Sequence, residues 1–114
     1  MIVPGLDCST QNSIEEVADA TVKTLFRTVS AAVPGISFLS GGQSAELATL
    51  RLNAMNQRFK SKMPWELSFS FARAIQAPAM EAWLGNDKNI EVAQSKLLER
   101  ASANKEARMR RYSS

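Results

Sequence analysis

A length of 114 residues, with 45% hydrophobic and 22% charged residues, fits one soluble globular domain or part of one. The sequence has no histidine, which excludes histidine-based triads and histidine-ligated metals, and Cys8 alone excludes an internal disulfide framework. The net charge of +3 is modest and no RNA-binding aromatic motif or zinc spacing is present, so we expect no nucleic-acid partner. Because no apolar run approaches a membrane span and no signal-like segment opens the chain, we expect no membrane association and a cytoplasmic location.

The first elements are a strand end and a helix. Residues 1–6 are typical of the end of a strand that runs into a loop at Pro4 and Gly5. Ser13 is a helix N-cap, and Glu16 three residues later completes a capping box. Apolar residues at helical spacing then predict a helix over residues 14–30.

A glycine turn follows the next predicted strand, over residues 36–40. Ser40, Gly41 and Gly42 form a tight turn, and Ser44 caps a second helix. In that helix we expect a buried stripe of Leu47, Leu50, Ala54 and Met55. The turn leaves two glycine N–H groups and a hydroxyl free to face an anion at a helix N-terminus, although most glycine-rich turns only reverse the chain.

Residues 66–71 alternate between apolar and polar side chains, which predicts a second strand that ends just before Arg73. Pro78 fits the first turn of a short helix that Gly85 terminates. Asp87 is expected to cap a last long helix, and the tail over residues 104–114 is expected to fray. The predicted buried face of that helix is Ile90, Ala93, Leu97, Leu98 and Ala101.

Strands that alternate with helices predict an α/β fold with a parallel sheet. Two strands and a stub are too few for such a sheet, so the chain is expected to be a piece of a larger one. Because parallel strands end on the same rim, the turn at Ser40–Gly42 and the pair Ala72–Arg73 should converge there. Amides, a hydroxyl and a guanidinium favour a phosphate dianion, and loops after the last strands of (β/α)₈ barrels commonly form such a site. The plainer alternatives are a salt bridge for Arg73 and a helix cap for Ser40.

Several segments, in order and in register, resemble the C-terminal part of class I fructose-bisphosphate aldolase. The resemblance covers almost the whole chain and is carried by VPGISFLSGGQS (33–44), LNAMN (52–56), SFSFARAIQA (68–77), MIVPG (1–5) and RASAN (100–104). It implies the last part of a (β/α)₈ TIM barrel over residues 1–114. The family is usually a homotetramer. It reversibly cleaves fructose 1,6-bisphosphate to triose phosphates in glycolysis and gluconeogenesis, through a lysine Schiff base and without a metal or other cofactor.

The resemblance also assigns substrate contacts. Leu39, Ser40, Gly41 and Gly42 fall on the substrate-binding turn, and Arg73 falls on the arginine that grips phosphate. The family has a glycine before that arginine, whose N–H contacts phosphate, where this chain has Ala72. Phe71 stands where the family usually has tyrosine.

The resemblance places the Schiff-base lysine and the acid/base carboxylates before Met1, and a functional tyrosine tail after the last residue. The 114-residue chain is therefore expected to be inactive alone. Its own lysines, Lys23, Lys60, Lys62, Lys88, Lys96 and Lys105, fall on predicted helices or surface loops. A solvated lysine keeps a high pKa and is a poor nucleophile. The alternative function is a non-catalytic interaction or scaffold module derived from an aldolase.

Overall fold

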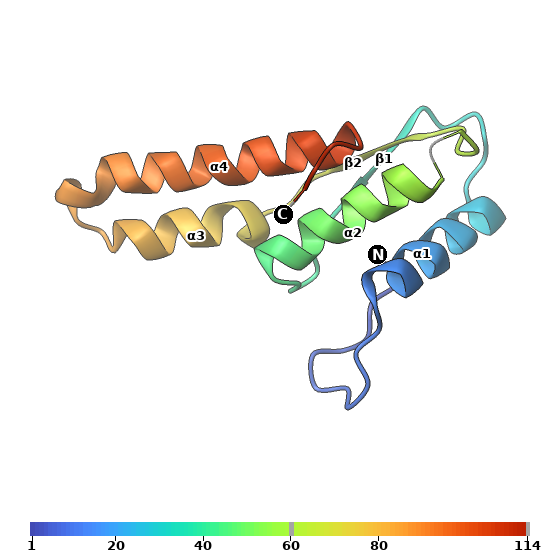
Figure 1. The fold of residues 1–114 in the computed structure, drawn as a ribbon, viewed down its shortest axis with the longest axis horizontal. Helices are drawn as coiled ribbons and strands as arrows, with labels where there is room; N and C mark the ends of the chain where they lie inside the picture. The colour runs from blue at the N-terminus through green and yellow to red at the C-terminus, as the bar shows by residue number, and fades with distance from the viewer. Residues whose placement is uncertain (60, 114) are drawn as a thin grey trace.

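The computed structural model describes residues 1–59 and 61–113, so Lys60, one of the lysines considered above, lies outside the described residues. Helices and strands alternate along the chain (Figure 1). Their bounds are α1 Ile14–Thr28, β1 Gly35–Phe38, α2 Ala45–Arg58, β2 Glu66–Phe69, α3 Arg73–Trp83, the 3₁₀ turn η1 Asp87–Asn89, and α4 Ile90–Arg108.

The two strands pair in parallel, as the order of elements predicted. Ile36 lies opposite Leu67 and Phe38 opposite Phe69, with α2 as the crossover between the strands. Both strands end two residues earlier than predicted, β1 at Phe38 and β2 at Phe69. A last bond of 2.8 Å from the Ser70 N–H to the Phe38 carbonyl closes the ladder, and the chain then turns into a helix.

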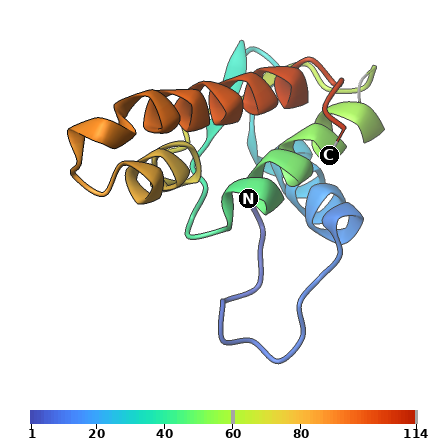
Figure 2. The same ribbon diagram turned by 60° about the vertical axis from the view of Figure 1, so that its left-hand side comes forward.

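Helix α2 lies between α1 on one side and α4 on the other (Figures 1 and 2). The core gathers around Leu52 and Met55 of α2, with Val22 of α1, Leu67 of β2 and Ala107 of α4, all at most 1% exposed. The segment before α1 loops away from the helices in both views. Residues 1–6, predicted as the end of a strand, form no strand in the structure.

Helix α1 confirms its predicted start. The Ser13 hydroxyl accepts from the Glu16 N–H at 3.1 Å, and the Glu16 carboxylate accepts from the Ser13 N–H at 2.8 Å. This reciprocal capping box satisfies two N–H groups that the first turn leaves free. The helix ends at Thr28, two residues before the predicted end.

The predicted buried stripe of α2 is wrong except for Met55. Leu47 is 38% exposed, and Leu50 and Ala54 are only half-buried. The buried residues are instead Ala48, Thr49, Arg51, Leu52, Asn53, Met55 and Asn56. Because helices cover α2 on two sides and the sheet on another, polar side chains are enclosed and satisfied by hydrogen bonds.

Helix α3 begins at Arg73, not near Pro78 as predicted. Pro78 lies inside the helix, where its missing N–H leaves the carbonyl of Ala74 without the usual donor. The backbone before a proline is biased away from helix, which explains the misplaced boundary. The end agrees better with expectation, since Leu84 (φ 55°) and Gly85 (φ 71°) both take the left-handed conformation that stops the helix.

The start and face of α4 also differ from the prediction. Asn86, not Asp87, provides the cap, because its side chain accepts from the Lys88 N–H at 3.0 Å and opens η1. The predicted face is exposed at Ile90 (41%), Leu97 (42%) and Leu98 (69%), while Ala93 and Ala101 are half-buried. The buried residues of α4 are Arg100, Asn104 and Ala107, on the half of the helix that packs against α2.

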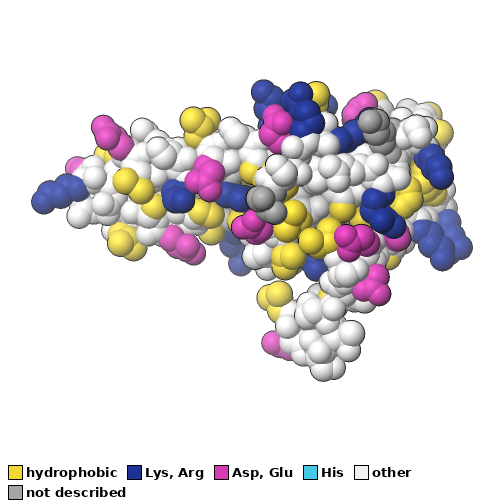
Figure 3. All heavy atoms as spheres, in the orientation of Figure 1, with side chains coloured by type: hydrophobic (Ala, Val, Ile, Leu, Met, Phe, Trp, Pro, Cys, Tyr) yellow, Lys and Arg dark blue, Asp and Glu magenta, His cyan; other side chains and the backbone are white. Residues whose placement is uncertain are grey.

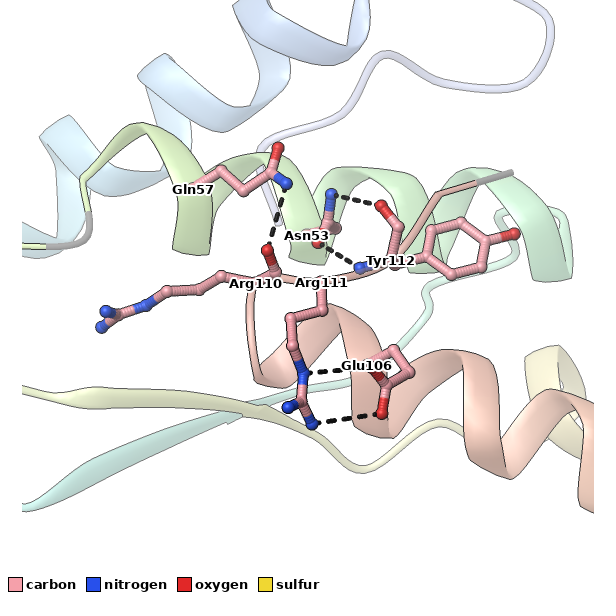
Figure 4. Close-up of polar contacts among 6 residues, drawn as sticks. All are labelled: Asn53, Gln57, Glu106, Arg110, Arg111 and Tyr112. Atoms are coloured by element: carbon pink, nitrogen blue, oxygen red, sulfur yellow. Dashed lines mark hydrogen bonds and ion pairs between the residues drawn. The ribbon is translucent and has the colours of Figure 1, made fainter.

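The segment from residue 104, predicted to fray, is held in place. The helix continues to Arg108 with Asn104 fully buried. Beyond it, Asn53 of α2 donates to the Tyr112 carbonyl and accepts from the Tyr112 N–H, both at 3.2 Å, and Gln57 donates to the Arg110 carbonyl at 3.2 Å (Figure 4). Two side-chain amides of α2 therefore tie the end of the chain to that helix.

Candidate functional site

The glycine turn after β1 is closed by a hydrogen bond of 3.1 Å from the Gln43 N–H to the Ser40 carbonyl. Both central residues have positive φ, 59° at Gly41 and 83° at Gly42, as in a type I′ turn. Within the described part of the chain, the N–H groups of these two glycines donate to no protein acceptor. The turn therefore presents two free donors next to the start of α2.

Helix α2 begins directly after this turn. The Ser44 hydroxyl caps it by accepting from the Leu47 N–H at 3.2 Å, as predicted. The helix N-terminus carries a partial positive charge from the aligned peptide dipoles. Free N–H groups and this dipole together favour an anion at the turn.

The Gln43 side chain braces the turn, a role that the sequence analysis missed. Its Nε2 donates to the Ser40 carbonyl at 2.6 Å, and its Oε1 accepts from Arg51 Nη1 at 2.9 Å. These bonds connect the turn to the second turn of α2. No local sequence pattern predicts these hydrogen bonds, because they form only when Arg51 is buried in the fold.

Arg73 meets the turn in space, as the convergence of strand ends predicted. A cavity of about 330 Å³ is lined by Gly42 and Ser44 on one side and by Arg73 on the other. The Arg73 side chain is exposed and, among the described residues, makes no hydrogen bond or ion pair. Glu81 lines the same cavity, so the site holds one carboxylate beside its guanidinium.

The other predicted contacts occupy different positions. Gly41 lines a neighbouring cavity, Ser40 is buried (7% exposed), and Leu39 is 70% exposed outside the cavity of Arg73. Ala72 is exposed and precedes α3 with φ −98° and ψ −86°. Because this φ is negative, an alanine takes the conformation that a glycine would have, and its methyl group demands no left-handed backbone.

A buried polar cluster of Thr49, Arg100 and Asn104, called the Thr49 cluster below, fixes the start of α2 against α4. Arg100 Nη2 donates to the Ala45 carbonyl at 2.9 Å and to the Thr49 hydroxyl. The Thr49 oxygen lies 2.8 Å from Asn104 Oδ1. The helix start that borders both cavities is thus anchored from behind by α4, a support that the sequence analysis also missed.

Among the described residues, no group of three or more histidine, cysteine, aspartate or glutamate side chains gathers as a metal site. The described lysines, 23, 62, 88, 96 and 105, are all exposed. On the face that Figure 3 shows, lysine and arginine side chains are spread from end to end rather than gathered in one patch.

Comparison with known proteins decides the family. The family model described as fructose-bisphosphate aldolase class-I matches residues 1–114. The chain belongs to the class I fructose-bisphosphate aldolase family. The cytoplasmic isozyme of Cicer arietinum is 54% identical over 112 residues, which cover 98% of this chain and 31% of that protein. Aldolase B of Gallus gallus is 54% identical over 104 residues, 91% of this chain and 28% of that protein.

The structural comparison agrees. Fructose-bisphosphate aldolase of Plasmodium falciparum, solved in complex with TRAP and a small-molecule inhibitor, matches with a TM-score of 0.92 and 41% identity. The match covers 100% of this chain and 32% of that one. The two strands and their helices are therefore part of a (β/α)₈ barrel, and the chain spans about a third of the length of these aldolases. Relatives are named both cytoplasmic and chloroplastic, and within the described residues no helix is long and apolar enough to cross a membrane.

Proposed function

We propose that this chain is part of a fructose-bisphosphate aldolase that cleaves fructose 1,6-bisphosphate reversibly to triose phosphates in the cytoplasm. Its contribution is one end of the phosphate site, formed by the glycine turn and Arg73. The observation that carries the proposal is the shared cavity of Gly42 and Arg73, two residues brought together only by the parallel strands. In the complete protein we propose the Schiff-base mechanism and the homotetramer that the resemblance implies.

The chemistry of this site suits a phosphate dianion. The N–H group of Gly42, which lines this cavity, is free, and the dipole of α2 adds positive potential at the same place. A guanidinium can add two parallel, charge-assisted hydrogen bonds, which only a planar fork provides. The Glu81 carboxylate works in the opposite direction, because it shares the cavity and repels a dianion.

A phosphate titration followed by amide NMR tests this assignment. Arg73→Gln should weaken phosphate binding roughly tenfold, because a hydrogen-bonded charge is lost. Glu81→Gln should strengthen it, and Arg27→Gln, an exposed arginine in the last turn of α1, should leave it unchanged. Equal affinity in the Arg73 and Arg27 variants would remove Arg73 from the site.

Transplanting the chain into a complete enzyme tests the catalytic role. The Cicer arietinum isozyme matches 98% of this chain over 112 residues, so the matched part of this chain can replace the corresponding segment of that isozyme. We expect the hybrid to cleave fructose 1,6-bisphosphate, and Arg73→Gln in the hybrid to raise KM. A folded hybrid without activity would contradict the proposal that this chain supplies a working part of the substrate site.

We further propose that the 114-residue chain has no aldolase activity of its own. Its described lysines are exposed, and a Schiff-base lysine needs a lowered pKa to act as a nucleophile. An assay with isotopically labelled fructose 1,6-bisphosphate tests this, with the hybrid enzyme as the positive control. Turnover above background would contradict the proposal.

A second candidate function, an interaction module, is favoured by one apolar groove between α3 and α4. Met80 (60% exposed), Trp83 (39%) and Leu97 (42%) line this groove of about 150 Å³. Exposed apolar patches mark association surfaces. Sedimentation of the purified chain tests this second function, since a chain that stays monomeric at all concentrations does not self-associate through this groove.

A further inference from the structure

Arg51 of α2 is a buried cation without a counter-charge. It is only 5% exposed, and its one hydrogen bond within the described residues runs from Nη1 to the neutral amide of Gln43 at 2.9 Å. Its Nε is buried and has no partner. The ion pairs of the described residues join Arg58, Lys96 and Arg111 to carboxylates, and none of them includes Arg51.

Arg51 lines a cavity of about 200 Å³. Gly41, Ser44 and Arg51 line it from the turn and α2, and residues 3–6 with Gln11 line it from the N-terminal segment. None of the described residues that line it carries a carboxylate. A water takes about 30 Å³ in the liquid, so the space holds a tetrahedral or planar oxyanion with some water.

This cavity differs from the cavity of Arg73. Gly41 lines the cavity of Arg51 and Gly42 lines the cavity of Arg73, while Gln43 and Ser44 border both. The turn and the start of α2 therefore separate two cavities, each with its own arginine.

The electrostatics of Arg51 call for an anion. Taking a guanidinium out of water without a partner is unfavourable, and arginine does not escape by losing its proton at neutral pH. Burial lowers the pKa of Arg51, in keeping with a charge that lacks compensation. The dipole of α2 and the free N–H of Gly41 add positive potential in the same place.

We propose that the cavity beside Arg51 is a second oxyanion site, which binds a phosphate or carboxylate group through the Arg51 guanidinium. The site does not depend on the proposed substrate contacts of Arg73. It does touch the same turn, because Gln43 accepts from Arg51 and donates to the Ser40 carbonyl at 2.6 Å. Occupation of this second site therefore acts on the turn that borders the first.

The Arg51 Nε–H NMR signal tests the proposal, since this group has no acceptor among the described residues. The titration uses the Arg73→Gln variant, in which phosphate binding at the cavity of Arg73 is weakened. We expect inorganic phosphate to shift the signal in a saturable manner. Acetate in a parallel titration shows whether a carboxylate is accepted as well. A signal that stays unmoved by both anions, or that moves equally with chloride at matched ionic strength, overturns the proposal.

Thermal unfolding gives an independent readout, because a ligand bound to the native state alone raises Tm. Phosphate should raise the Tm of the Arg73→Gln chain, and adding Arg51→Gln should weaken that phosphate dependence at least tenfold in affinity. Arg51→Lys keeps the charge but loses the fork, so we expect an intermediate affinity. An equal phosphate dependence with and without Arg51, in folded variants, also overturns the proposal.

Discussion

Replacing Gly41 by alanine tests whether the turn needs its left-handed backbone. Gly41 has φ 59°, and a Cβ built on it meets nothing within 4 Å. The substitution therefore adds no steric clash, and any loss of stability comes from the backbone conformation alone. A non-glycine residue in this region costs about 1–2 kcal/mol.

We expect Gly41→Ala to lower the free energy of unfolding by about 1–2 kcal/mol, measured by urea denaturation. In thermal unfolding this corresponds to a fall of about 4–8 °C in Tm per kcal/mol for a domain near this size. Gly41→Asn should lose less, because asparagine tolerates the left-handed region better than alanine.

Gly5→Ala is the matched control. A Cβ at Gly5 also meets nothing within 4 Å, but its φ is not positive. Alanine there should be neutral or should stabilise by about 0.4–1 kcal/mol, through a less flexible unfolded chain. Equal stabilities of the Gly41 and Gly5 variants would refute the left-handed turn, and with it the orientation of the free N–H groups.

Three further changes address the packing, the C-terminal segment and the pH dependence. Thr49→Val keeps the shape but leaves the buried Thr49 cluster without its hydroxyl, so we expect a loss of about 1–3 kcal/mol by urea denaturation, against little change for the exposed Thr24→Val. Asn53→Ala removes both hydrogen bonds to Tyr112. Hydrogen exchange should then show that the backbone N–H of Tyr112 loses protection while the protection of α2 stays unchanged. The backbone N–H of the N-cap Ser13 lowers the pKa of Glu16 below its ordinary 4.5. The Glu16 carboxylate therefore stabilises the fold above pH 4.5, and this effect is lost as the pH falls through the folded-state pKa. Glu16→Gln should flatten the acid side of a plot of stability against pH, and an unchanged plot would contradict the capping box.

The parts that the sequence predicted well depend on local chemistry. The capping box at Ser13 and Glu16 fixes where α1 begins. Alternating apolar and polar side chains mark the second strand, and the order strand, helix, strand predicts that the two strands pair in parallel. The meeting of Gly42 and Arg73 in one cavity followed from the rule that parallel strands end on one rim. Whether these residues bind phosphate stays a prediction.

The parts that it missed depend on contacts distant in sequence. The buried face of α2 includes Thr49, Arg51 and Asn56, which hydrophobic periodicity reads as solvent-facing. Their enclosure is possible because acceptors and donors reach them from elsewhere, as when Asn56 donates to the carbonyls of Leu67 and Ala107. No window of sequence contains both halves of such a bond.

Pro78 affects how firmly the backbone around Arg73 is held. The first turn of α3 is anchored by the Ala72 carbonyl, which accepts from the N–H groups of Ile75 and Gln76 at 3.0 and 2.9 Å. One turn later the proline interrupts the ladder, so this turn is weakly fastened to the rest of the helix. Arg73 therefore lies in a helical turn that lacks one backbone hydrogen bond to the next turn. The glycine turn opposite is held by the Gln43 side chain and by the cap of α2. We therefore expect that, if a ligand binds at the proposed site, Arg73 adjusts to it more readily than the glycine turn does.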